Sequence, residues 1–178
     1  MAAGRTRQQN RQPEQPLTPE QAEAAAHNKA LDLLAGRDYG ADELYRKLCD
    51  RFEAGAAASV VARLVQVGLL DDERYALGRA RMAMQQHKSR REARQLLTGR
   101  GLDRELVDRA LDAVWQEAAE EGDDPDLQAA RTLLARKYRA KVEQGRPDLA
   151  AAALLRKGFG FGTVRRALRE LDAELPEE

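Results

Sequence analysis

Apolar residues recur along most of this chain at intervals of three and four, and the segments that carry them commonly end in glycine. Val60, Val61 and Leu64, followed by Gly68, show the pattern. This spacing places apolar side chains on one face of an α-helix. No stretch of useful length alternates apolar and polar residues as a half-buried strand does, and aromatic residues make up only 4% of the chain. The sequence therefore predicts an all-α protein.

Signals for helix starts divide the pattern into nine helices. Thr18, Pro19 and Gln21 have the residue types of a capping box with proline in the first turn. We expect Ser59 to cap the third helix and Asp72 to cap the fourth, because their side-chain oxygens can accept from free amides there. Further starts are expected at Ser89, at Asp124 with Pro125, and at Pro147.

The nine predicted helices fall into three similar blocks of three. Each block repeats a leucine, a turn residue four positions later and another apolar helix, with the pairs Leu48 and Phe52, Leu97 and Gly101, and Leu154 and Gly158. Spacings of 49 and 57 residues between the blocks suit three-helix units. Such units stack on their neighbours, so we expect three tandem three-helix blocks in an elongated, curved array, with Asp72 at the first junction.

The predicted organisation places polar ends around these blocks. Residues 1–17 are rich in Gln, Arg and Pro and offer almost nothing to bury, which predicts disorder. The remaining boundaries are block 1 at 18–69, block 2 at 70–121, block 3 at 122–173 and an acidic end at 174–178.

Charge is segregated although the whole chain has a net charge of zero. Residues 74–102 carry a net charge of +7, residues 103–126 carry −8, and residues 127–169 carry +9. One interpretation is that the acidic stretch neutralises its basic neighbours inside the protein. The other is that a basic face contacts an anionic partner, such as nucleic acid or an acidic protein groove. The sequence leaves both open.

The sequence offers no set of residues for catalysis, for a metal or for a cofactor. His27 and His87 lie 60 residues apart, and the single cysteine, Cys49, excludes an internal disulfide and a cysteine-based zinc cluster. The consecutive acids at 71–73 could hold a cation, but acids at the start of a helix more often cap it and interact favourably with the helix dipole. No apolar run approaches the roughly 20 residues that span a bilayer. We therefore expect a soluble, intracellular protein that is not an enzyme.

The segment 157–161, Lys-Gly-Phe-Gly-Phe, is similar to the aromatic strand with which RRM domains bind RNA. The match breaks at Gly162 and Val164, and no strand is predicted for it to lie on. We expect Gly158 to end a helix and Phe159 or Phe161 to pin the following turn.

Several segments resemble the RecX family of bacterial regulators of the RecA recombinase. Residues 30–34 and 37–44 are similar to its first helical pair, residues 90–97 with Gly101 to its second block, and residues 157–161 with Val164 and Leu168 to its third. His87-Lys88-Ser89 departs from the glycine expected before the basic pair. The most specific segment is the junction motif Gly68, Leu69, Leu70, Asp71, Asp72, Glu73, Arg74, Tyr75 and Ala76.

The resemblance implies three tandem three-helix blocks and a regulator without enzymatic activity. It implies a cytoplasmic protein that binds the RecA–DNA filament, inhibits strand exchange and ATP hydrolysis, and hinders filament growth in DNA recombination, DNA repair and the SOS response. We expect a monomer that needs no cofactor and no membrane. From charge clustering alone, we expect the filament or its DNA to contact Arg79, Arg81, Lys88, Arg90, Arg91, Arg94, Lys137, Arg139, Arg156, Lys157, Arg165 and Arg166.

Two other functions remain open at this stage. A stand-alone helical module could bind single- or double-stranded DNA, or RNA, without RecA and with strong salt dependence. A scaffold for other helical proteins would depend on neither DNA nor RecA.

Overall fold

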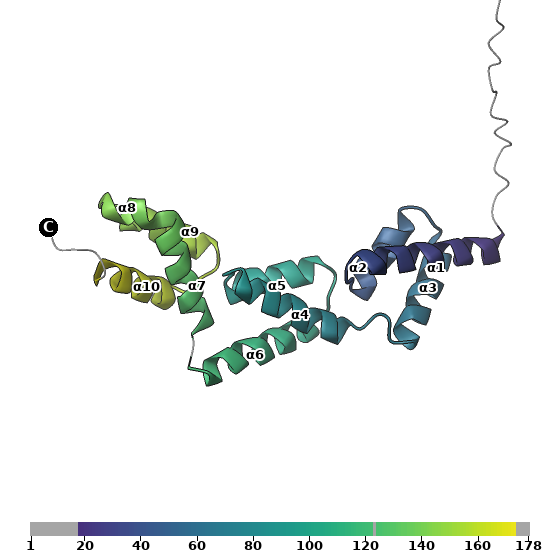
Figure 1. Ribbon diagram of the computed structural model, residues 1–178. Helices are drawn as coiled ribbons and strands as arrows, with labels where there is room; N and C mark the ends of the chain where they lie inside the picture. The colour runs from purple at the N-terminus through teal and green to yellow at the C-terminus, as the bar shows by residue number, and fades with distance from the viewer. Residues whose placement is uncertain (1–17, 123, 174–178) are drawn as a thin grey trace, which may run out of the picture.

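The computed structural model describes residues 18–122 and 124–173, and all the regular elements in these residues are helical. Figure 1 shows three groups of helices in a row along an elongated body, from the purple N-terminal group to the yellow-green C-terminal one. The predicted all-α array of three-helix blocks is confirmed. The expected tail at 1–17 and acidic end at 174–178 lie outside the described residues. In the described part, no helix is both long and apolar enough to cross a membrane.

Block 1 consists of α1 (Pro19–Gly36), α2 (Ala41–Cys49) and α3 (Ala54–Gln66). The predicted capping box is present, since the Gln21 amide donates to Thr18 Oγ1 at 3.3 Å and the Thr18 amide donates to Gln21 Oε1 at 3.0 Å. The three helices enclose one apolar cluster, which includes Ala26, Ala30, Leu44, Leu48, Val60 and Leu64.

Two cap predictions are wrong in detail. Ser59 lies inside α3, which already begins at Ala54 because the intervening residues are mostly alanine, the best helix former. Ser59 Oγ instead donates to Glu23 Oε1 on α1 at 2.7 Å. The cap of the fourth helix is Asp71, whose Oδ1 accepts from the Arg74 amide at 2.9 Å. Asp72 is the first residue of that helix, which frees its carboxylate for another contact.

Block 2 consists of α4 (Asp72–Gln85), α5 (Arg90–Gly99) and α6 (Arg104–Glu120). Ser89 caps α5 as predicted, since its Oγ accepts from the Glu92 amide at 3.1 Å. Alanines on α4 let this helix lie close to α6, and Trp115 packs into the core as expected. The cluster includes Tyr75, Ala76, Ala80, Ala93, Leu97, Val107, Leu111, Val114 and Trp115.

Block 3 begins with one helical run over residues 125–143, composed of α7 (Pro125–Leu133), a π-helical segment η1 (Leu134–Tyr138) and α8 (Arg139–Glu143). It continues with α9 (Pro147–Arg156) and α10 (Phe161–Ala173). Asp124 caps α7 as predicted. Of the two phenylalanines expected to pin the last turn, Phe159 does so at 3% exposure, whereas Phe161 is 71% exposed. The core includes Leu127, Leu134, Ala150, Leu154, Phe159, Val164 and Ala167.

Candidate functional site

The first junction, which we call joint 1, forms where α4 meets the start of α2. Asp72 Oδ1 accepts from the Ala41 backbone amide at 2.8 Å. Ala41 is the first residue of α2, and its N-cap, Gly40, offers no side chain to satisfy that amide. A side chain at Gly40 would crowd the same carboxylate, because a Cβ there would lie 3.2 Å from Asp72 Oδ1. The predicted junction role of Asp72 therefore holds, with the residue capping the helix of the preceding block.

Glu43 lies at the centre of joint 1 and gathers groups from both blocks. Its carboxylate accepts from Tyr75 Oη at 2.9 Å, from Arg100 Nη1 at 3.1 Å and from Arg37 Nη2 at 2.9 Å. Burial by itself would raise the pKa of Glu43, but the hydrogen bonds from Arg37 and Tyr75 and the attraction of the two arginines outweigh it and lower the pKa from 4.5. Glu43 is thus held as a carboxylate that ties block 2 to block 1.

The second junction, joint 2, repeats the arrangement between blocks 2 and 3. Asp126, near the start of α7, accepts from the Arg90 backbone amide at 3.0 Å, and Arg90 is the first residue of α5. The same oxygen accepts from Trp115 Nε1 at 3.2 Å. Ser89, which is fully buried, donates through Oγ to the Lys157 carbonyl at 2.6 Å. In both joints an aspartate of one block caps the second helix of the block before it.

A glycine completes each joint. Gly101 and Gly158 follow the second helix of blocks 2 and 3 with φ values of +88° and +90°. A Cβ at Gly101 would overlap the Asp42 carboxylate, and one at Gly158 would lie 2.9 Å from Ser89 Oγ. The corresponding residue of block 1 is Phe52, which has no earlier block in the described chain to contact. The glycines therefore serve the approach of one block to another, in addition to ending a helix.

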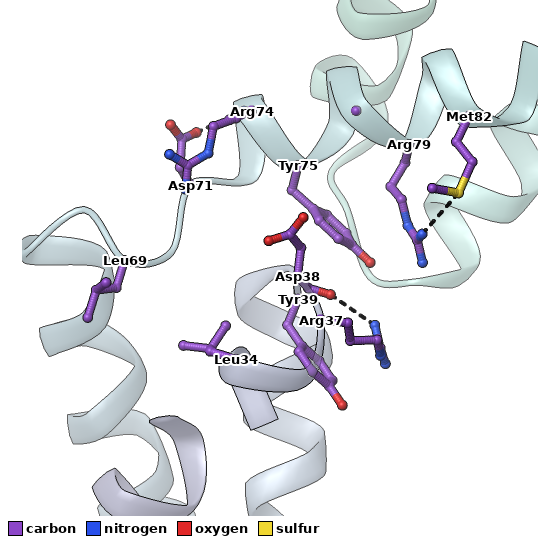
Figure 2. Close-up of a pocket in the computed structure, with 11 residues that line it drawn as sticks. Leu34, Arg37, Asp38, Tyr39, Leu69, Asp71, Arg74, Tyr75, Arg79 and Met82 are labelled. Carbon is purple, nitrogen blue, oxygen red and sulfur yellow. Dashed lines mark hydrogen bonds between the residues drawn. The ribbon is translucent and has the colours of Figure 1, made fainter. Parts of the chain in front are cut away.

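A groove of about 410 Å³ opens beside joint 1. Figure 2 shows the residues that line it, with Tyr75, Arg79 and Met82 on α4 on one side and Leu34 and Tyr39 of block 1 on the other. Arg79 lies 5.3 Å from the ring centre of Tyr75 and donates to Met82 Sδ at 3.5 Å. These contacts hold the Arg79 guanidinium near an aromatic ring and a sulfur atom, so the α4 side of the groove combines cationic and apolar surface.

The junction motif at 68–76 lies mainly in structural positions. Gly68 has a φ of +73° at the end of α3, and Leu70 and Ala76 are buried. Leu69 is 51% exposed at the rim of the groove, and Arg74 is exposed. The motif thus supplies residues of joint 1 and leaves Leu69 and Arg74 exposed.

The basic residues expected in block 2 divide into paired and unpaired sets. Arg90 pairs with Asp112 and Arg94 with Asp108, across the faces of α5 and α6. Arg91 is exposed and makes no ion pair with any described residue. Internal neutralisation therefore operates within block 2. The other pairs are Arg81 with Glu117 at 3.2 Å and Lys88 with Glu92 at 2.9 Å.

The basic residues expected in block 3 are less neutralised. Arg139 pairs with Glu143 at 2.8 Å, and Arg166 pairs with Glu170 at 3.0 Å. The other four are Lys137, Arg156, Lys157 and Arg165, and none makes an ion pair with a residue that the structure describes. Arg156 and Lys157 lie at the end of α9, and Arg91 lies beside the residue that follows them, since a Cβ at Gly158 would be 3.0 Å from Arg91 Cβ.

Sequence reasoning missed Glu43, Arg37, Arg100 and Asp126. Arg37 and Glu43 are only 6 residues apart, but the contacts that make them part of a joint, to Tyr75 and Arg100, span 32 and 57 residues, and the contact of Asp126 with Arg90 spans 36. The available signal was the repetition of an acid just inside the first helix of successive blocks. Within residues 18–122 and 124–173, no three His, Cys, Asp or Glu side chains gather where they could hold a metal ion.

Comparison with known proteins shows which family has this sequence and arrangement. Residues 26–64 match the model of the RecX first three-helix domain, and residues 71–111 match that of the second. The regulatory protein RecX of Stenotrophomonas maltophilia is 35% identical over 150 residues, which cover 79% of this chain and 83% of the relative. That of Trichlorobacter lovleyi is 37% identical over 144 residues, covering 77% and 89%.

Solved structures show the same fold. The crystal structure of RecX from Lactobacillus salivarius has a TM-score of 0.68 at 21% identity and covers 85% of this chain and 97% of that one. A second crystal structure of a regulatory protein RecX has a TM-score of 0.69 at 23% identity and covers 85% and 73%. With these architectures shared and the sequence relatives matched over most of their length, the chain belongs to the RecX family.

Proposed function

We propose that this protein binds the RecA–DNA filament and inhibits the recombinase, its ATPase activity and the extension of the filament. Membership of a family of regulatory proteins is the observation that carries the proposal. An elongated array of three blocks also suits a partner with a long repeating surface, because each block presents its own face. The role is regulatory, without a reaction of its own, in the DNA recombination, repair and SOS response of the bacterial cytoplasm.

We infer that the unpaired cations carry most of the contact with the filament. Arg91 lies beside Gly158 at joint 2, Arg156 and Lys157 immediately precede that glycine, and none of the three makes an ion pair with a described residue. Bringing an unpaired exposed cation to a phosphate or carboxylate breaks no internal ion pair, whereas recruiting Arg90 or Arg94 would separate it from an aspartate. The contact surface proposed here is thus narrower than the full basic set.

The test is ATP hydrolysis by RecA on single-stranded DNA, measured with increasing amounts of the protein. Inhibition that grows with the protein-to-RecA ratio, together with slower filament extension, is the expected result. ATPase activity that is unchanged at saturating protein contradicts the proposal.

A stand-alone nucleic-acid module is the second candidate, favoured by the +9 net charge of residues 127–169. Binding to naked DNA that matches binding to the filament in strength, and falls steeply with salt, would support it instead.

A further inference from the structure

A second groove, of about 590 Å³, lies on block 3 between α9 and α10 and reaches the end of α8. Its apolar lining includes Val142, Ala151, Leu155, Phe161 and Leu168. Phe161 is 71% exposed, although its neighbour Phe159 is buried and already fills the core beneath the turn. A large aromatic side chain gains stability when it leaves water, so folding of block 3 alone does not explain its position at the mouth of the groove.

The repeat shows why this groove exists in block 3. A shift of 57 residues superimposes the buried positions of the two blocks, so that Leu97 and Val107 correspond to Leu154 and Val164. In block 2 the two helices of the hairpin are joined outside the core by the ion pairs Arg90–Asp112 and Arg94–Asp108. With the same shift, the positions of Arg90 and Arg94 correspond to Pro147 and Ala151. The positions of Asp108 and Asp112 correspond to Arg165 and Arg169.

Block 3 has therefore lost both carboxylates and has arginines in their places. Arg165 and Arg169 line the groove, and neither makes an ion pair with a described residue. The facing positions on α9, Pro147 and Ala151, carry no charge and leave space where the block 2 arginines lie. Asp172, at the far end of the lining, is the one carboxylate among the residues that form the groove.

From this substitution we infer that the groove binds a protein segment that carries carboxylates next to apolar side chains. The carboxylates would take the place that Asp108 and Asp112 have in block 2, and the apolar side chains would cover Phe161, Leu155 and Leu168. A segment held between two helices in this manner combines apolar burial with charge-assisted hydrogen bonds. The inference rests on the proposed function, since the segment belongs to the protein component of the filament.

The test measures the affinity of the labelled full-length protein for RecA filaments on single-stranded DNA, and separately for the same DNA without RecA. Phe161→Asp and the pair Arg165→Asp with Arg169→Asp should each weaken filament binding by about tenfold or more, with naked-DNA binding changed far less. Leu96→Asp is the matched control, because Leu96 is an apolar residue, 43% exposed, on α5 of block 2, and it should leave both affinities within about twofold.

Each outcome separates the two levels of the argument. Absence of filament binding by the unaltered protein contradicts the proposed function itself. Normal filament binding by both groove variants overturns the groove inference alone. An equal loss on filaments and on naked DNA also overturns it, because the groove would then bind nucleic acid. Circular dichroism and thermal melting check folding, and the arginine pair, which lies outside the core, keeps the test valid if Phe161→Asp unfolds.

Discussion

At the scale of single residues, the joints depend on carboxylates that bond to the block before them. Asp72 and Asp126 each accept from the first amide of a preceding helix, at 2.8 Å and 3.0 Å. A residue without a hydrogen-bond acceptor on a short side chain cannot replace either aspartate. The backbone amide of Ala41 or Arg90 would then lack a partner at a partly buried site.

Asp72→Ala should lower the free energy of unfolding by roughly 0.5–2 kcal/mol, the usual cost of a lost helix cap. The helix affected is α2, which belongs to the other block. Glu73→Ala is the control. Glu73 is exposed, and its ion pair with Arg109 is long, at 3.7 Å, so its loss should change stability by less than about 0.5 kcal/mol. Urea unfolding measures both. Equal losses in the two variants would contradict the capping role.

The lowered pKa of Glu43 predicts a pH dependence at joint 1. Because the folded state holds this carboxyl below its ordinary pKa of 4.5, its contribution to stability is complete above about pH 4.5 and disappears as the pH falls further through the folded-state value. The stability difference between the wild type and Glu43→Gln should therefore be largest near neutral pH and shrink in acid. Unfolding curves from pH 7 to pH 3 measure it, with exposed Glu53→Gln as control. A difference that does not change with pH contradicts the prediction.

The two glycines of the joints should be the least replaceable of those in turns. Gly101→Ala would place a methyl group against Asp42 at a φ of +88°, and should both strain the turn and separate the blocks. Gly78→Ala on α4 is the contrast, since nothing lies within 4 Å of a Cβ there and alanine favours a helix by up to about 1 kcal/mol. Thermal melting should move down for the first and slightly up for the second. A neutral Gly101→Ala would show that the joint has room to adjust.

At the scale of helices, local signals were predictable and long-range ones were not. Thr18, Ser89 and Asp124 cap the helices in which they were expected, because a cap and its amide lie within three residues of each other. The prediction that Ser59 caps α3 is wrong, because a serine followed by an apolar run has the pattern of a helix start. The alanines before Ser59 instead extend the helix back to Ala54.

The candidate site was less accessible to such reasoning. Charge clustering located the basic faces, yet it could not separate Arg91 from Arg90, since the difference lies in Asp112, a residue 22 positions from Arg90 that folding brings beside it. The exposure of Phe161 was equally hidden, because either phenylalanine of the turn could have filled the core.

Charge reversal distinguishes the two sets of arginines. Arg90→Glu with Arg94→Glu would place like charges opposite Asp112 and Asp108. Because two half-exposed ion pairs are lost, block 2 should be destabilised by about 1 kcal/mol. Arg91→Glu with Arg156→Glu breaks no ion pair with a described residue and should change stability by less than about 0.5 kcal/mol, but weaken inhibition of RecA. Melting and ATPase assays on both variants measure this. Normal inhibition by the second variant would move the contact surface elsewhere.

At the scale of the whole molecule, the apolar cores are separate. Each of the three clusters draws its buried residues from the helices of one block and their connecting turns, with Leu70, just after α3, packing into the core of block 1, and none of these residues is shared between clusters. The blocks meet instead through carboxylates, amides, a buried hydroxyl and close-approaching glycines. Each block is therefore stabilised by its own buried apolar surface. The orientation of one block relative to the next is set by the directional polar contacts of joints 1 and 2.

Separate cores give the array a particular mechanics. Bending a continuous core opens apolar surface to water, whereas tilting one block against the next strains hydrogen bonds whose net contribution is roughly 0.5–1.5 kcal/mol each. Deformation is therefore concentrated at two hinges, and the links between them stay stiff. A body of this kind can bend by small rotations at Asp72 and Asp126 while every block keeps its shape, which is what the proposed function would need on a helical filament whose pitch changes.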